Sequence, residues 1–146
     1  MKSKLLLEEN GSKTFALVFD KDEEIKQPLL TLAAEHGLSA AQVTAIGAFS
    51  DVTLGYFDRK TNRYLEIRVR EQVEVLSFTG NIVQKDNEPK LHAHVVIGKS
   101  DGTAHGGHFL RGTVWPTLEM IVSETPRHLR RVHDAETGLP LIDVAA

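Results

Sequence analysis

The sequence predicts a single α+β domain in which a largely antiparallel sheet is flanked by one helix. Only one segment has the apolar spacing of an amphipathic helix, whereas seven or eight short runs have the composition or alternation of strands. The connections between these runs are mostly too short for the crossover helices that parallel strands require. The length of 146 residues is also that of one domain.

The first expected strand covers residues 14–19, which are β-branched, aromatic and apolar. An amphipathic helix follows, because apolar residues recur from Ile25 at the i, i+4, i+7 and i+8 positions. Asp22 is the expected N-cap of this helix. Pro28 lies inside the pattern, where a proline is unfavourable in a helix. The helix is therefore expected to begin either directly after Asp22 or at Lys26 or later.

The remaining expected strands follow in order along the chain. Residues 64–70 alternate polar side chains with Leu, Ile and Val, the period-two pattern of a strand with one exposed face. The others are short apolar runs rich in β-branched residues. The set comprises residues 43–48, 52–58, 64–70, 73–78, 91–98, 104–110 and 113–123. The apolar stretch 139–144 is expected to add an edge strand or to pack on a neighbouring molecule.

Composition and charge exclude several classes of function. The chain has no cysteine, so any metal site must use nitrogen and oxygen ligands. No apolar run approaches the roughly 18–20 residues of a membrane-spanning helix, and the N-terminus lacks a secretory pattern, so a cytoplasmic protein without a membrane partner is expected. The 17 basic and 20 acidic residues give a net charge of −3, which opposes broad non-specific binding to phosphate backbones.

The sequence is rich in histidine, a common metal ligand, with seven residues. His92 and His94 are two residues apart in an expected strand, so their side chains share the face opposite an apolar face. A three-residue hairpin loop with Gly102 in the left-handed conformation would place His108 opposite His94 and turn His105 away. A two-residue loop would instead turn His108 to the other face, unless a bulge restored it.

Three neutral imidazoles without a thiolate suit Zn²⁺ and leave a fourth position for water or a substrate. The same donors also accept Ni²⁺, Co²⁺, Fe²⁺ or Cu²⁺. The alternative interpretation is that these histidines are polar residues on the exposed face of an amphipathic strand. Glu119 is an acid inside an otherwise apolar strand. It is a candidate fourth ligand, base or partner of a ligating imidazole, or else an ordinary solvated strand residue.

Three motifs, in this order along the chain, resemble the PPC (plants and prokaryotes conserved) domain over approximately residues 14–123. They are GAFSDVTL at 47–54, VEVLSFTG at 73–80, and LHAH at 91–94 followed by DG at 101–102 and GGH at 106–108. The resemblance implies an antiparallel sheet with a flanking helix, a homotrimer, and a metal, usually zinc, bound by His92, His94 and His108. Residues 124–146 then form a C-terminal extension.

The resemblance also implies a DNA-binding or regulatory role, from which this chain departs in two respects. It has no AT-hook of the plant relatives, and Gln72-Val73-Glu74 replaces their Arg-Phe-Glu stretch. DNA contact would rest on basic residues of the extension, which could equally be a solvated segment paired with surface acids. These residues are Arg127, Arg130 and Arg131.

Two further interpretations stay open beside DNA binding. The first is a metal-dependent enzyme or a small-ligand sensor that uses the open coordination position, although no familiar hydrolase, kinase or metalloprotease motif identifies a reaction or a substrate. The second is a structural metal that holds the hairpin or the subunits together, with Phe109, Leu110 and Trp115 closing an apolar interface beside the site.

Overall fold

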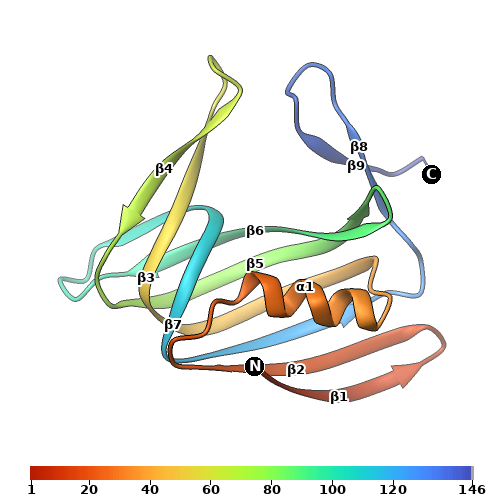
Figure 1. The fold of residues 1–146 in the computed structure, drawn as a ribbon, viewed down its shortest axis with the longest axis horizontal. Coiled ribbons are helices and arrows are strands. Elements are labelled where there is room, and N and C mark those ends of the chain that lie inside the picture. The colour runs from red at the N-terminus through yellow and green to blue at the C-terminus, as the bar shows by residue number, and fades with distance from the viewer. Residues whose placement is uncertain (146) are drawn as a thin grey trace.

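The computed structural model describes residues 1–145, in which nine strands form one sheet and a single helix lies against it (Figure 1). The strand order is β1-β2-β7-β3-β5-β8-β9, with β4 paired to β3 and β6 paired to β5 and β7. The elements are β1 (Lys2–Glu9), β2 (Ser12–Asp20), α1 (Lys26–Glu35), β3 (Ala40–Asp58), β4 (Arg63–Val69), β5 (Val73–Lys85), β6 (Glu88–Gly98), β7 (Ala104–Glu124), β8 (Arg130–His133) and β9 (Pro140–Asp143).

Strands β3 and β7 are long and bent, where the sequence predicts two short strands in each place. Their mutual register shifts near Gly47, Phe49, Asp51 and Thr53. Such shifts let a strand bend without leaving the sheet, so no turn separates the expected pieces. Figure 1 shows both strands running along the sheet and then turning upward at its left end. The prediction of a largely antiparallel sheet is confirmed, since among the strands of residues 1–145 only the short β5–β8 contact is parallel.

Helix α1 covers one face of the sheet and buries Leu29, Leu32 and Ala33 against the core. It begins at Lys26, so Pro28 falls in the first turn, where a missing N–H breaks no helical hydrogen bond. The expected cap from Asp22 is wrong. The Glu24 carboxylate instead accepts hydrogen bonds from the N–H groups of Lys26 and Gln27, at 3.0 and 3.2 Å. This helix is short, and no helix in residues 1–145 is long and apolar enough to span a membrane.

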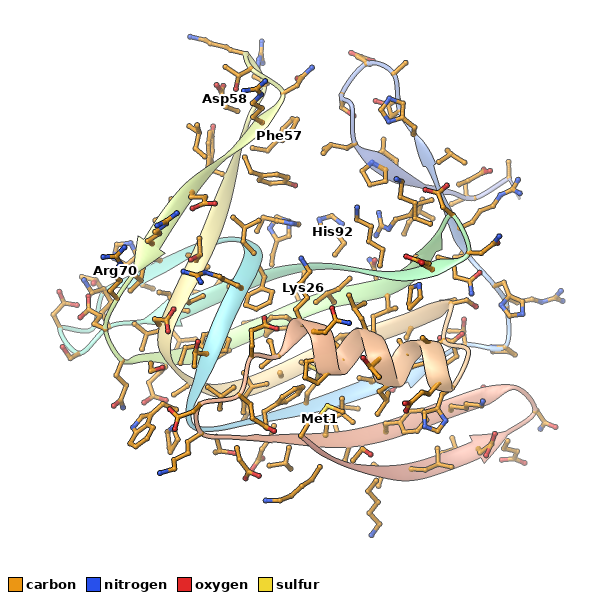
Figure 2. The ribbon with its side chains drawn as sticks, in the orientation of Figure 1. Met1, Lys26, Phe57, Asp58, Arg70 and His92 are labelled. Carbon is orange, nitrogen blue, oxygen red and sulfur yellow. The ribbon has the colours of Figure 1, made fainter. Side chains whose placement is uncertain are left out.

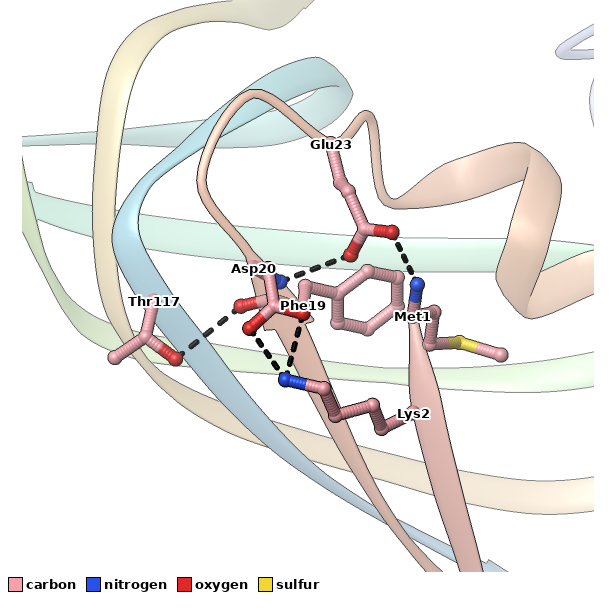
Figure 3. Close-up of polar contacts among 6 residues, drawn as sticks. All are labelled: Met1, Lys2, Phe19, Asp20, Glu23 and Thr117. Carbon is pink, nitrogen blue, oxygen red and sulfur yellow. Dashed lines mark hydrogen bonds and ion pairs between the residues drawn. The ribbon is translucent and has the colours of Figure 1, made fainter.

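Strand β1 is an edge strand that the sequence analysis did not predict, because all eight of its residues are exposed and it carries no buried face. It pairs antiparallel with β2. Figure 3 shows the polar contacts at its start, where the Met1 amino group bonds to Glu23 and the Lys2 ammonium donates to Asp20 Oδ1 at 2.9 Å. On the other side of β2, the Thr117 hydroxyl donates to the carbonyl oxygen of Phe19 at 3.2 Å.

A buried carboxylate joins the end of β7 to the start of β3. Glu124 is only 8% exposed. Its Oε1 atom accepts hydrogen bonds from the Ser39 N–H at 2.9 Å and the Ala40 N–H at 3.1 Å, and from the Ser39 hydroxyl at 3.3 Å. The Ser39 hydroxyl also contacts His128 Nδ1. Backbone donors that follow α1 are thereby satisfied by one side chain from a distant strand.

Two hairpins rise on the same side of the sheet, one on either side of the middle of β6 (Figure 1). The first is β3–β4, and the second is β8–β9, which belongs to the predicted C-terminal extension. The expectation of an edge strand in residues 139–144 agrees with β9. The second hairpin meets the sheet through one ladder pair, Gln84 with Arg130.

Candidate metal centre

The β6–β7 hairpin has the register that its turn chemistry predicts. Gly102 has a φ of +82°, the left-handed conformation that glycine adopts without strain. Its N–H donates to the Lys99 carbonyl at 2.9 Å, and the Lys99 N–H donates to the Thr103 carbonyl at the same distance. The resulting three-residue loop places His94 directly opposite His108.

His92, His94 and His108 form a compact cluster on one face of this hairpin. The ring centroids are 5.1 Å apart for His92 and His108, 5.3 Å for His92 and His94, and 5.5 Å for His94 and His108. One potential ligand nitrogen from each ring lies within 4.8 Å of the other two. His105 pairs with Ile97 and lies outside the cluster, as expected.

The backbone beneath the cluster is held close to strand β5. Gly80 of β5 pairs with Ala93 of β6. A Cβ atom at residue 80 would lie 2.7 Å from Ala93 Cβ and 2.8 Å from Ala93 Cα, which real contacts do not allow. The glycine therefore permits the close approach that places His92 and His94. Their opposite face is buried, with Leu91, Ala93, Val95 and Ile97 in the core.

Tyr64, a residue that the sequence analysis did not associate with the site, orients one of the three rings. Its ring stacks on the His108 imidazole, with centroids 4.5 Å apart and planes 22° from parallel. Burial raises the pKa of Tyr64. Gly55 of β3 lies between the two strands, paired with His108 of β7 and with Glu66 of β4, and a Cβ atom there would lie 2.8 Å from the Tyr64 ring. The contact thus depends on the pairing of three strands, so no local sequence signal could have revealed it.

The environment favours neutral imidazoles at His92 and His108, the form that binds a metal ion. Burial, followed by the neighbouring His92 and His94, lowers the pKa of His108 to about 4. Burial and then Arg131 lower the pKa of His92. The Nδ1 atom of His108 is buried and has no hydrogen-bond partner within residues 1–145. Unprotonated rings with a free buried nitrogen are the donor set that a divalent transition metal requires.

A pocket of about 270 Å³ opens beside the cluster, between the two raised hairpins. Figure 2 shows His92 in the space between these hairpins and Lys26 on the helix side of it. The lining residues come from α1, β4, β6, β7 and the β8–β9 hairpin. They are Lys26, Tyr64, Lys90, Leu91, His92, His108, Arg131, Leu139, Pro140 and Leu141.

The prediction of three exposed basic residues in the extension is wrong for Arg131. The alternation of strand β8 turns it inward, where it is 8% exposed. Its Nη1 donates to the Pro140 carbonyl at 2.8 Å, and its Nη2 donates to Asn81 Oδ1 at 2.5 Å. Arg127 and Arg130 are exposed, as expected. Arg131 therefore belongs to the pocket and cannot contact a flat DNA surface.

The structure does not bring Glu119 to the histidines. It is exposed and pairs with Val18 of β2 and Ile46 of β3, and it is not a member of the cluster. Of the apolar residues expected beside the site, Phe109 is buried in the core against Phe49 and Phe78, whereas Trp115 is 39% exposed, with the Lys21 ammonium 5.5 Å from its ring centroid. Their role in a subunit interface stays a prediction.

Fold and site together describe a one-domain protein whose bent antiparallel sheet presents a histidine triad in a pocket. The Plants and Prokaryotes Conserved (PCC) domain matches residues 6–126, and the chain belongs to this family. The recognition of this family from three sequence motifs is confirmed. No curated protein matches the chain.

Several solved structures have the same fold. A "putative DNA binding protein" from Bacteroides thetaiotaomicron is 27% identical, with a TM-score of 0.85 over 97% of this chain and 96% of that one. A metal-containing protein from Archaeoglobus fulgidus is 34% identical, with a TM-score of 0.81 over 88% of this chain and 91% of that one. A plant- and prokaryote-conserved (PPC) protein from Pyrococcus horikoshii is 26% identical, with a TM-score of 0.84 over 99% of this chain and 96% of that one.

Proposed function

We propose that His92, His94 and His108 bind one divalent transition metal ion, for which zinc is best suited, and that the ion keeps a coordination position open to the pocket. The observation that carries the proposal is the convergence of three ligand nitrogens within 4.8 Å. The description of the Archaeoglobus fulgidus relative as metal-containing supports it. Imidazole donors without thiolate or carboxylate fit zinc and its first-row neighbours.

The make-up of the cluster favours ligand binding over a purely structural role. Structural zinc sites are normally closed by four protein ligands, whereas sites that bind a substrate or water use three. Within residues 1–145 the cluster consists of the three histidines alone. The adjoining pocket gives a small molecule access to the remaining position. When bound, the ion would supply Lewis-acid chemistry. The part of the chain would be to hold the ion through the three imidazoles.

Zinc binding is tested directly on the wild-type protein. Metal-stripped protein titrated with zinc is expected to bind one equivalent per chain, measured by elemental analysis after gel filtration. Replacing zinc with Co²⁺ is expected to give a visible spectrum that changes when azide is added, because azide fills an open position. A stoichiometry near zero would contradict the metal site, and a spectrum that azide leaves unchanged would contradict the open position.

We also propose that the protein forms the homotrimer that the family resemblance implies. The sheet face opposite α1 supports self-association, because it exposes Ile46 (62%), Leu76 (54%) and Ile121 (42%) around a groove of about 540 Å³. Exposed apolar surface of this kind is typical of subunit interfaces.

Light scattering after gel filtration is expected to give three times the mass of one chain. Ile46→Glu places a charge in this surface and is expected to yield monomers; an unchanged mass would exclude this face as the interface.

DNA binding is a second candidate function. The Bacteroides thetaiotaomicron structure carries a DNA-binding description, and the exposed Arg127 and Arg130 could contact phosphates. The expected result is a gel shift of duplex DNA that weakens steeply as salt is raised. Arg127→Gln combined with Arg130→Gln should weaken it further. A protein that gives no shift even at low salt does not bind DNA.

A further inference from the structure

The pocket beside the histidines contains a buried cation that no acid of the described chain neutralises. Arg131 is 8% exposed, and its side-chain hydrogen bonds go to the neutral oxygens of Asn81 and Pro140. No carboxylate within residues 1–145 forms an ion pair with it. Its Nε atom is buried without any partner in the same residues. A buried charge is costly unless an opposite charge meets it, so the arginine is prepared for an anion that the chain does not supply.

The other charged side chains that line the pocket are also positive. Lys26 and Lys90 join Arg131, and none of the ten lining residues is acidic. A divalent ion on the histidines would add to this positive potential. A concave site lined by one sign of charge concentrates ligands of the opposite sign.

The geometry points to a small organic anion as the ligand of this pocket, with an oxyanion group, carboxylate or phosphate, held by Arg131 and Lys90 beside the metal position. Two of the five guanidinium donors of Arg131 are used within the chain, which leaves Nε and further N–H groups for a bidentate contact. The inference deepens the proposed metal function and rests on it for the neighbouring metal, although the arginine contact does not require the ion.

The size and the remaining walls of the pocket restrict the ligand further. A volume of about 270 Å³ lies just below the roughly 300 Å³ at which pockets for drug-sized molecules begin. Leu91, Leu139 and Leu141 give it an apolar side. A compact anion with a short carbon skeleton fits this combination better than a nucleotide or a polymer.

The test uses calorimetric titration of zinc-loaded protein with succinate and with inorganic phosphate, and with succinamide as the uncharged match of succinate. At least one of the two anions is expected to bind, and succinamide is not. Stronger binding of succinate or of phosphate identifies which oxyanion the pocket prefers. Arg131→Gln is expected to weaken anion binding at least tenfold while it retains one zinc per chain. Arg70→Gln, the same change at an exposed arginine outside the pocket, is expected to leave binding unchanged.

The outcomes separate this inference from the metal proposal. Full zinc content without binding of either anion would overturn the anion site alone. Anion binding by a chain that takes up no zinc would overturn the metal site alone. Equal anion affinity in Arg131→Gln and wild type would also overturn the inference. If Arg131→Gln does not fold, Lys90→Gln is the deciding variant. It is expected to lose anion affinity several-fold, and unchanged anion affinity would overturn the site.

Discussion

Replacing His94 with alanine is expected to lower zinc affinity by roughly 100- to 1,000-fold. Zinc sites with four protein ligands contribute about 10–16 kcal/mol, or about 2.5–4 kcal/mol for each ligand, and every 1.4 kcal/mol corresponds to a tenfold change. His94 is the exposed member of the cluster, so its removal leaves the core intact. Competition with a chelating dye of known zinc affinity measures the loss.

The matched control is His105→Ala in the same hairpin. His105 is also exposed, but it lies outside the cluster, so its replacement should leave zinc affinity unchanged. Equal affinities in the two variants would show that the three histidines are not the ligand set. His108→Ala is a less discriminating test, because it also removes the stacking contact with Tyr64.

Replacing Glu124 with alanine is expected to lower the free energy of unfolding by about 3 kcal/mol. The side chain accepts hydrogen bonds from the N–H groups of Ser39 and Ala40 and from the Ser39 hydroxyl. Each buried donor left without an acceptor costs roughly 1–3 kcal/mol. Urea unfolding followed by circular dichroism measures the change, with gel filtration to establish that the oligomeric state is the same.

Two variants distinguish this network from the general loss of an acid. Glu124→Gln keeps one oxygen acceptor and places an amide donor against the same N–H groups, so an intermediate loss is expected. Glu136→Ala removes an exposed acid from the loop between β8 and β9 and should change stability by less than about 0.5 kcal/mol. If Glu124→Ala were as stable as Glu136→Ala, the buried contacts would not be important for folding.

The candidate site was predictable to the extent that it depends on local structure. The spacing of His92 and His94, the Asp-Gly turn and the position of His108 all lie within one hairpin, and the observed register agrees with the expected one. The start of α1 was predictable for the same reason, because a proline inside an amphipathic pattern acts locally.

The remainder depends on contacts between distant segments. Tyr64 reaches His108 only because β4, β3 and β7 pair side by side and Gly55 leaves room for its ring. Arg131 is buried only because the C-terminal hairpin folds toward Asn81. The length of β3 and β7 could not be read from composition, because bulges and turns favour similar residues. Strand β1 has no buried face, so it lacks the alternation by which a strand is recognised.

The division of the pocket between two parts of the chain has an evolutionary consequence. The three histidines lie within residues 6–126, the part that matches the family, whereas Arg131, Leu139, Pro140 and Leu141 lie beyond it. The C-terminal hairpin meets the sheet through a single ladder pair. Substitutions there can change the shape and charge of the pocket without disturbing the three histidines. Under the proposed function, ligand preference can therefore diverge among relatives that keep the same proposed metal ligands, and a chimera that exchanges only this hairpin is expected to transfer the preference with it.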